Sequence, residues 1–220
     1  MSDLTRAAER SRAAKIALRN RLLTSRRSLT SNELAAAAAQ IQGQTLSLVR
    51  RERPSVIAAY VPIGSEPGGP GLVTALAEHA RVLLPVLLPD GDLDWAAHQP
   101  SPTGPAGLPD AWADGLNLVA GRRGLLEPAG PRLGVSAVAG ADLVLVPALA
   151  VDRSGLRMGR GGGSYDRALG RLPAAGGPLV VALLHDGELV ETVPSEPHDS
   201  PVHAVITPGG GLTVFADRPV

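Results

Sequence analysis

The order of apolar and polar positions along the chain predicts helices that alternate with strands. Residues 4–24 carry a ragged apolar stripe at helical spacing among basic residues, which predicts a basic helix. Thr30 and Glu33 form a capping-box pattern, which predicts that an Ala-rich helix begins there and runs to about Arg51. Two shorter helices are expected near residues 72–80 and 164–172.

Short apolar runs predict the strands of a buried sheet. The runs lie at residues 55–61, 82–88, 141–150, 179–184 and 203–207, with an edge strand at 212–215. Pro85 weakens the second strand, because proline cannot donate to a ladder, and residues 99–110 hold four prolines and two glycines, which predict a loop. Several runs are apolar on both faces, as is typical of parallel strands between helices. We therefore predict one α/β domain over residues 1–220, with a mostly parallel sheet flanked by helices in three αβα layers.

Composition and charge exclude several classes of protein. The chain is 44 % apolar and 19 % charged, which excludes a wholly disordered chain. Its net charge of zero and its few aromatic residues argue against a nucleic-acid partner. The absence of cysteine excludes disulfides, thiolate nucleophiles and Cys-ligated metals. The longest apolar stretch is nine residues, whereas a membrane span needs about 20, and the N-terminus lacks a signal-peptide core. We expect a cytoplasmic monomer without a membrane partner.

A glycine cluster at residues 157–166 is the most informative stretch of the sequence. Glycines allow main-chain N–H groups to converge on an anion, and the helix that follows adds its N-terminal donors. Arg157 and Arg160 bring positive charge to the same place. The run is not a Walker A loop, and Ser164 stands where G-x-G-x-x-G requires glycine. A phosphate site is the favoured interpretation, and a flexible loop capped by Ser164 is the alternative.

The same cluster carries a resemblance to a known family. The run from Asp152 through Gly155, Arg157 and the glycines to Asp166 resembles the signature of 5-formyltetrahydrofolate cyclo-ligases, also called methenyltetrahydrofolate synthetases. Four further segments resemble family elements in the same order: Lys15-x-x-Leu18-Arg19, residues 60–66, residues 124–128, and residues 193–207 with His198-Asp199. The chain departs from many members at Ser164, where they have an aromatic residue, and from some at Gly162, where they have lysine. These departures concern the fine ATP or folate contacts and not the class of reaction.

The resemblance implies an ATP-dependent ligase that closes 5-formyltetrahydrofolate, with or without a polyglutamate tail, to 5,10-methenyltetrahydrofolate. It implies ATP and Mg²⁺ as cofactors, and catalytic roles for Lys15, Arg157 and Arg160. Val61 and Glu66 would bind the folate, and Asp166 and Asp199 would bind Mg²⁺. The residues that it assigns to ATP are Lys15, Arg19, Arg157, Met158, Gly159, Arg160, Gly161, Gly162, Gly163, Ser164 and Tyr165.

Without the resemblance, several of these residues have simpler interpretations. Lys15 is the only lysine beside twenty arginines, and is either an exposed residue or a point-charge phosphate ligand. Glu66 follows a strand at the edge where open sheets bind ligands, but it is also a plausible turn residue. Asp166 suits a helix N-terminus without a metal, and Asp199 suits an Asx turn. Two other functions stay open: a different phosphate- or nucleotide-using enzyme, such as a sugar-phosphate isomerase, and a non-catalytic nucleotide- or folate-binding regulator.

Overall fold

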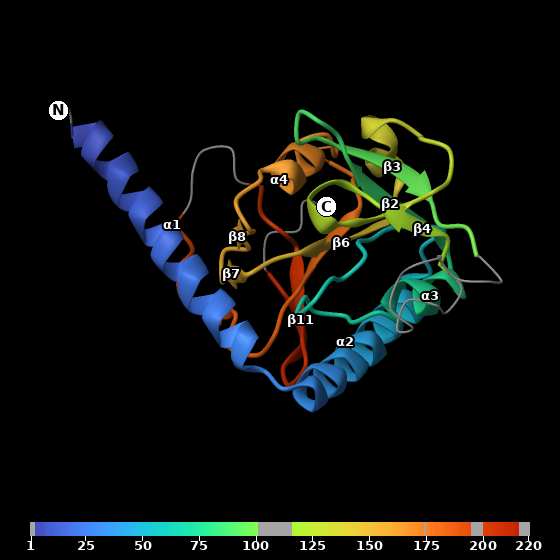
Figure 1. The fold of residues 1–220 in the computed structure, drawn as a ribbon, viewed down its shortest axis with the longest axis horizontal. Coiled ribbons are helices and arrows are strands. Elements are labelled where there is room, and N and C mark those ends of the chain that lie inside the picture. The colour runs from blue at the N-terminus through green and yellow to red at the C-terminus, as the bar shows by residue number, and fades with distance from the viewer. Residues whose placement is uncertain (1–2, 101–115, 174, 195–199, 216–220) are drawn as a thin grey trace.

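A mixed seven-stranded sheet forms the centre of the molecule (Figure 1). The structure is a computed structural model that describes residues 3–100, 116–173, 175–194 and 200–215. The strand order is β12-β11-β9-β6-β1-β2-β3. The five inner strands are parallel, and β3 and β12 are antiparallel edges, which confirms the mostly parallel sheet. The strands are β1 (Val56–Ala58), β2 (Arg81–Leu87), β3 (Leu93–Ala97), β6 (Leu143–Pro147), β9 (Leu179–Leu183), β11 (Ala204–Thr207) and β12 (Gly211–Val214).

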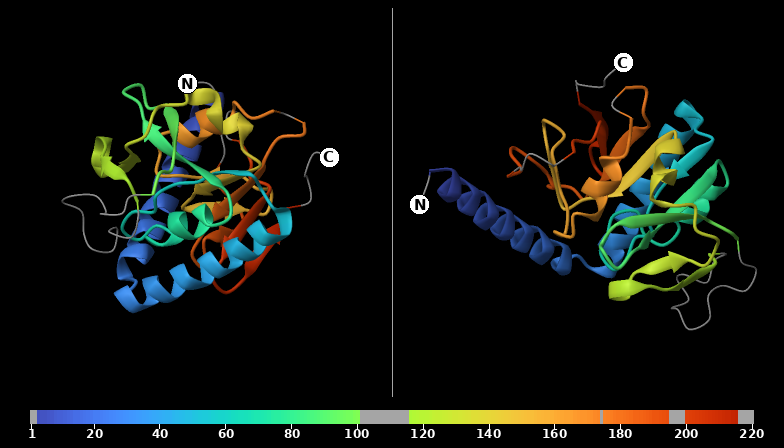
Figure 2. Two further views of the ribbon diagram at one scale, coloured as in Figure 1. Left: turned by 90° about the vertical axis from the view of Figure 1, so that its right-hand side faces the viewer. Right: turned by 90° about the horizontal axis from the view of Figure 1, so that it is seen from above.

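Helices cover both faces of this sheet, as the sequence predicts (Figure 2). Helices α2 (Ser31–Glu52) and α3 (Leu72–Ala77) pack with the strand residues of one face. Helix α4 (Ser164–Leu169) and the 3₁₀ helix η3 (Val135–Gly140) pack on the other. Successive strand residues alternate between the two apolar clusters, so that Ile57 and Leu84 face α2 while Ala58 and Leu83 face α4. Among the helices of the described residues, none combines the length and the apolar character that a membrane crossing needs.

The N-terminal helix α1 (Asp3–Ser28) stands away from the sheet and packs on a smaller one (Figure 1). That sheet has the order β10-β7-β8, with β7 at Ala150–Asp152, β8 at Arg157–Met158 and β10 at Leu189–Val190. Leu22 of α1 is buried in an apolar cluster with Leu149 and Met158. A separate hairpin of β4 (Leu118–Ala120) and β5 (Leu126–Pro128) is joined through the 3₁₀ helix η2 (Arg122–Gly124).

Local signals explain where helices begin, while several strand and helix ends differ from expectation. The capping box is confirmed, since the Thr30 side chain accepts from the Glu33 main chain and the Glu33 side chain accepts from the Thr30 main chain. The predicted strand at 141–150 is two strands, because the chain turns after Pro147 and joins a different sheet. Helix α4 ends at residue 169 and not near 172. The predicted loop at 99–110 falls mostly outside the described residues.

Pro85 lies inside β2 despite its missing N–H group, and the register explains why the sheet tolerates it. Ala59 donates its main-chain N–H to Leu83 O, beside the end of β1. Further along β2, the N–H of Leu87 donates to Glu127 Oε1, which replaces a neighbouring strand. Alternate residues of β2 present their main-chain groups to the same side, so Pro85 faces the gap where β1 has already ended.

Candidate active site

One cavity of about 590 Å³ lies between α1, the glycine loop and the carboxyl ends of β1 and β6. The glycine loop is defined here as residues 159–163, between β8 and α4. Asp199 lies outside the described residues, and every other predicted site residue lines the cavity. These residues are Lys15, Arg19, Val61, Glu66, Arg157, Met158, Gly159, Arg160, Gly161, Gly162, Gly163, Ser164, Tyr165 and Asp166. Three chain segments distant in sequence therefore meet at one place.

The glycine loop packs closely against arginine side chains. Gly161 has a φ of 100°, and a Cβ atom built on it would lie 3.2 Å from Arg19 Nη2. Arg19 Nε also donates to Gly159 O at 3.3 Å. A Cβ atom on Gly159 would lie 3.0 Å from Arg157 Nη1. Glycine is thus favoured at Gly161 because the main chain there is in the left-handed region, and a side chain at Gly159 or Gly161 would also have to displace a guanidinium group.

The helix after the glycine loop contributes less than expected. Helix α4 has six residues, and Gly163 is its N-cap in a left-handed conformation, without a side-chain cap. The alternative interpretation is therefore wrong in one respect: the N-cap of the helix is Gly163 and not Ser164. Because so short a helix has a weak dipole, the positive charge at this end of the cavity comes from the arginines.

Arg157 is nearly fully buried, with 3 % of its side chain exposed, and it engages Asp166. Its Nη2 donates to Asp166 Oδ1, and its guanidinium carbon lies 5.8 Å from the centroid of the Tyr165 ring. Its Nε is buried and has no hydrogen-bond partner among the residues that the structure describes. Burial raises the pKa of Tyr165, so this tyrosine stays neutral at physiological pH. Arg157 is thus a fixed cation at the wall of the cavity.

The ion pair limits what Asp166 can offer to a metal ion. One of its carboxylate oxygens already accepts from Arg157. Within the described part of the chain, no group of three or more histidine or acidic residues is placed to hold a metal. This donor set fits Mg²⁺ only in the manner common at nucleotide sites, where one or two carboxylates act together with phosphate oxygens and water.

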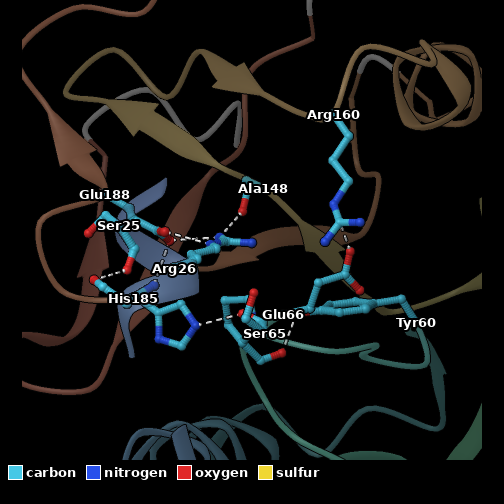
Figure 3. Close-up of polar contacts among 11 residues, drawn as sticks. Ser25, Arg26, Tyr60, Ser65, Glu66, Ala148, Arg160, His185 and Glu188 are labelled. Atoms are coloured by element: carbon cyan, nitrogen blue, oxygen red, sulfur yellow. Dashed lines mark hydrogen bonds and ion pairs between the residues drawn. The ribbon is translucent and has the colours of Figure 1, made fainter. Parts of the chain in front are cut away.

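Glu66 lies beside the glycine loop, although some ninety residues separate them in sequence (Figure 3). Its Oε1 is 3.4 Å from Arg160 Nε, and its Oε2 accepts from the main-chain N–H of Ile63 at 3.1 Å. Burial raises the pKa of Glu66 above its ordinary value of 4.5, and the Ile63 hydrogen bond and Arg160 oppose that rise. Glu66 and Arg160 both line the cavity, and their contact joins the loop after β1 to the glycine loop.

Several cavity residues escaped the sequence analysis. Arg12 and Arg26 line the cavity from the same side of α1 as Lys15 and Arg19, at spacings that repeat along one helix face. That spacing is the signal in the sequence that could have identified Arg12 and Arg26, but a basic stripe on a helix usually faces solvent. The other half of the wall is mostly apolar, and comes from a loop, two strands and the β4–β5 hairpin. Its apolar residues include Ile63, Pro85, Leu87, Leu93, Leu125 and Leu126.

We expect Glu66→Gln to unfold at a higher temperature than the parent at pH 7. The raised pKa means that the folded state disfavours the ionised carboxylate, so Glu66 lowers stability as the pH rises from 4.5 through the raised pKa. Glutamine removes this cost, and the half-exposed Arg160 loses only a weak ion pair. Thermal unfolding between pH 4 and 8 measures the effect, which should vanish at the acidic end. Glu52→Gln, at an exposed pair with Arg51, is the control, and a lower Tm for Glu66→Gln at pH 7 would contradict the expectation.

Comparison with known proteins agrees with the residues at the site. The family model described as the 5-formyltetrahydrofolate cyclo-ligase family matches residues 11–208. The chain is 40 % identical over 208 residues to the 5-formyltetrahydrofolate cyclo-ligase of Mycolicibacterium smegmatis, which covers 92 % of this chain and 97 % of that protein. It is 34 % identical over 130 residues to the cyclo-ligase of Escherichia coli K12, which covers 58 % of this chain and 63 % of that protein.

Solved structures share the fold. The NMR structure of the Aquifex aeolicus 5,10-methenyltetrahydrofolate synthetase superposes with a TM-score of 0.72 at 24 % identity, covering 94 % of this chain and 95 % of that one. The synthetase of Mycoplasma pneumoniae superposes with a TM-score of 0.63 at 17 % identity, covering 87 % and 96 %. The matches in sequence and in fold span nearly the whole chain, which therefore belongs to the 5-formyltetrahydrofolate cyclo-ligase family.

Proposed function

We propose that this chain catalyses the ATP-dependent closure of 5-formyltetrahydrofolate to 5,10-methenyltetrahydrofolate, with release of ADP and phosphate. One observation carries the proposal beyond family membership: a single cavity joins a basic half, suited to phosphates, to an apolar half, suited to a heterocycle. Arg160 of the basic half and Glu66 of the apolar half are in contact, so the two substrates would meet beside them.

The reaction needs ATP because the formyl oxygen of an amide-like group is a poor leaving group. In the proposed sequence, the formyl oxygen attacks the γ-phosphoryl group of ATP, and the bond between that group and ADP breaks. N10 of the folate then attacks the formyl carbon and loses its proton to solvent, the five-membered ring closes, and phosphate leaves with the former formyl oxygen. The protein's contribution is to position the two substrates and to stabilise charge during phosphoryl transfer.

The residues of the basic half have distinct tasks in this mechanism. The half-exposed side chains of Lys15 and Arg160 can move with the phosphoryl group as it is transferred. The buried Arg157 is held in place by Asp166. Arg19 lies against the glycine loop, whose main-chain N–H groups are the proposed phosphate cradle. Mg²⁺ would be held by the second oxygen of Asp166 together with phosphate oxygens, and would neutralise phosphate charge.

The apolar half is proposed to hold the pterin ring system, with Val61 at its wall and Glu66 as its acidic member. A carboxylate can accept hydrogen bonds from the N–H groups of the heterocycle, which gives the folate one orientation. Five points remain predictions: the location of the chain, its oligomeric state, its single-domain organisation, its preference for polyglutamate tails and the role of Asp199.

The decisive assay follows the absorbance of the methenyl product with and without ATP and Mg²⁺. We expect product only when both are present. Product formation without ATP would contradict the mechanism, and turnover of a sugar phosphate in its place would favour an isomerase. Binding of ATP or folate without turnover would favour a non-catalytic regulator.

Glu66→Gln tests the assignment of the folate half. The substitution keeps the size of the side chain but removes the carboxylate, so the affinity for 5-formyltetrahydrofolate should fall by about tenfold or more. The affinity for ATP should stay within about twofold of the parent, since Glu66 is not one of the proposed phosphate ligands. Isothermal calorimetry with each substrate separately measures both, and loss of ATP binding with retained folate binding would reverse the assignment.

A further inference from the structure

Three buried polar side chains form a continuous chain of contacts that begins at Arg26 in the cavity wall (Figure 3). Arg26, Glu188 and His185 are 3 %, 4 % and 7 % exposed. Arg26 Nε lies 2.6 Å from Glu188 Oε1, and its Nη2 lies 2.8 Å from Glu188 Oε2. The same Nη2 donates to Ala148 O at 2.5 Å. The forked geometry fixes both side chains, because a buried charge that loses its partner is costly.

The chain of contacts continues from Glu188 to the loop that bears Glu66. Glu188 Oε2 accepts the main-chain N–H of His185 at 2.7 Å, which anchors that residue at the end of β9. The His185 ring Nε2 lies 2.9 Å from Ser65 O. A carbonyl oxygen can only accept, so Nε2 carries the proton and donates it. Ser65 O belongs to the peptide that links Ser65 to Glu66.

The loop at residues 61–70 has no helix or strand of its own to hold it. Its main-chain carbonyls accept hydrogen bonds instead from side chains outside the loop. Tyr60 donates its hydroxyl to Pro67 O at 2.6 Å, and Gln42 Nε2 donates to Gly68 O at 2.7 Å. The His185 contact is the third of these, and it falls next to Glu66. An irregular segment keeps one conformation only if its polar main-chain groups are satisfied in this way.

We propose that His185 is a positioning residue that holds Glu66 at the folate half of the cavity, and that Glu188 and Arg26 fix His185 for this task. The inference rests on the proposed function, because it assigns the effect of losing the His185 contact to folate binding. Arg26 belongs to α1, the helix that carries Lys15 and Arg19. The three residues thus connect the helix at the phosphate half to the loop at the folate half.

His185→Leu removes the donor and keeps an apolar side chain in the buried space. The loop should then hold Glu66 less well, and the KM for 5-formyltetrahydrofolate should rise by about tenfold, as expected for one lost hydrogen bond. The KM for ATP should stay within about twofold, since the phosphate ligands lie elsewhere. His185→Gln places an amide donor near the position of Nε2 and should return the folate KM to within about threefold of the parent.

His203→Leu is the matched control. The His203 ring also binds a main-chain group, since its Nδ1 accepts from Val180 N at 2.9 Å, but His203 does not line the cavity. This variant should lose stability and leave both KM values unchanged. Circular dichroism measures the folded fraction of each variant, and kinetics are compared at equal folded fraction. A loss of folded protein in His185→Leu is then not mistaken for a change in KM.

The outcomes separate this inference from the proposed function. If the parent shows no ATP-dependent folate closure, the proposed function fails. If the parent is active and His185→Leu keeps the parent's folate KM, or raises both KM values equally, the positioning role is overturned. If the leucine variant does not fold, His185→Asn replaces it, because its amide is too short to reach Ser65 O. A folate KM within threefold of the parent in that variant would also overturn the inference.

Discussion

Gly161→Val should lower the affinity for ATP by about a hundredfold or more while the chain stays folded. Gly161 has a φ of 100°, which a β-branched residue adopts only with strain. Its new Cβ would lie 3.2 Å from Arg19 Nη2 and 3.3 Å from the guanidinium carbon. The loop must therefore change its path or displace Arg19, and either change disrupts the proposed phosphate cradle. Calorimetry with ATP measures the loss.

Gly134→Val is the matched control for backbone strain. Gly134 has a φ of 90° and nothing within 4 Å of its added Cβ, and it does not line the cavity. Both variants should lose stability, but only Gly161→Val should lose ATP affinity. Unchanged ATP affinity in folded Gly161→Val protein would remove the glycine loop from the phosphate site.

Lys15→Arg should lower kcat/KM for ATP by about a hundredfold, although it preserves the charge. Lys15 lies on the cavity side of α1, one helical turn before Arg19. An ammonium group is a compact point charge, whereas a guanidinium is a wider planar fork. If Lys15 contacts the transferred phosphoryl group, the fork displaces that group, and a shift of about 1 Å can cost about a hundredfold in rate. Steady-state kinetics at equal folded fraction measures the effect.

Arg21→Lys is the reverse exchange at an exposed position of the same helix, outside the cavity. It should leave kcat/KM unchanged, and both variants should keep their unfolding free energy within about 0.5 kcal/mol of the parent. Equal kcat/KM in the parent and Lys15→Arg would show that the lone lysine is an accident of composition.

The parts of the site that sequence could predict depend on local rules. The sequence predicts Glu66 at the ligand-binding edge because Glu66 follows a buried run, and the cavity lies at that edge. The glycine run predicts an anion site because glycines allow main-chain N–H groups to converge and because Arg157 and Arg160 flank them. Thr30 and Glu33 marked a helix start that the structure reproduces. In each case the signal and its structural consequence lie within a few residues of each other.

The parts that sequence missed depend on which distant segments meet. The contact of Arg160 with Glu66 joins segments some ninety residues apart. In the sequence, Arg26 does not differ from the other cations of a basic helix, and only the fold places Glu188 against it. The strand β3 and its hairpin with β2 were also missed, although Asp90-Gly91 between them is a recognised turn signal.

The buried pair of Arg26 and Glu188 restricts how this family member can change in evolution. A substitution that removes one partner leaves the other charge buried without compensation, at a cost of about 3–5 kcal/mol. A domain of this size has a total stability of only about 5–15 kcal/mol. A protein that had replaced only Arg26 or only Glu188 would therefore be barely folded. Positions 26 and 188 should therefore be inherited together or exchanged together, for example for two apolar residues that fill the same volume. A lineage that made this exchange would keep its core and would need another acceptor for the main-chain N–H of His185.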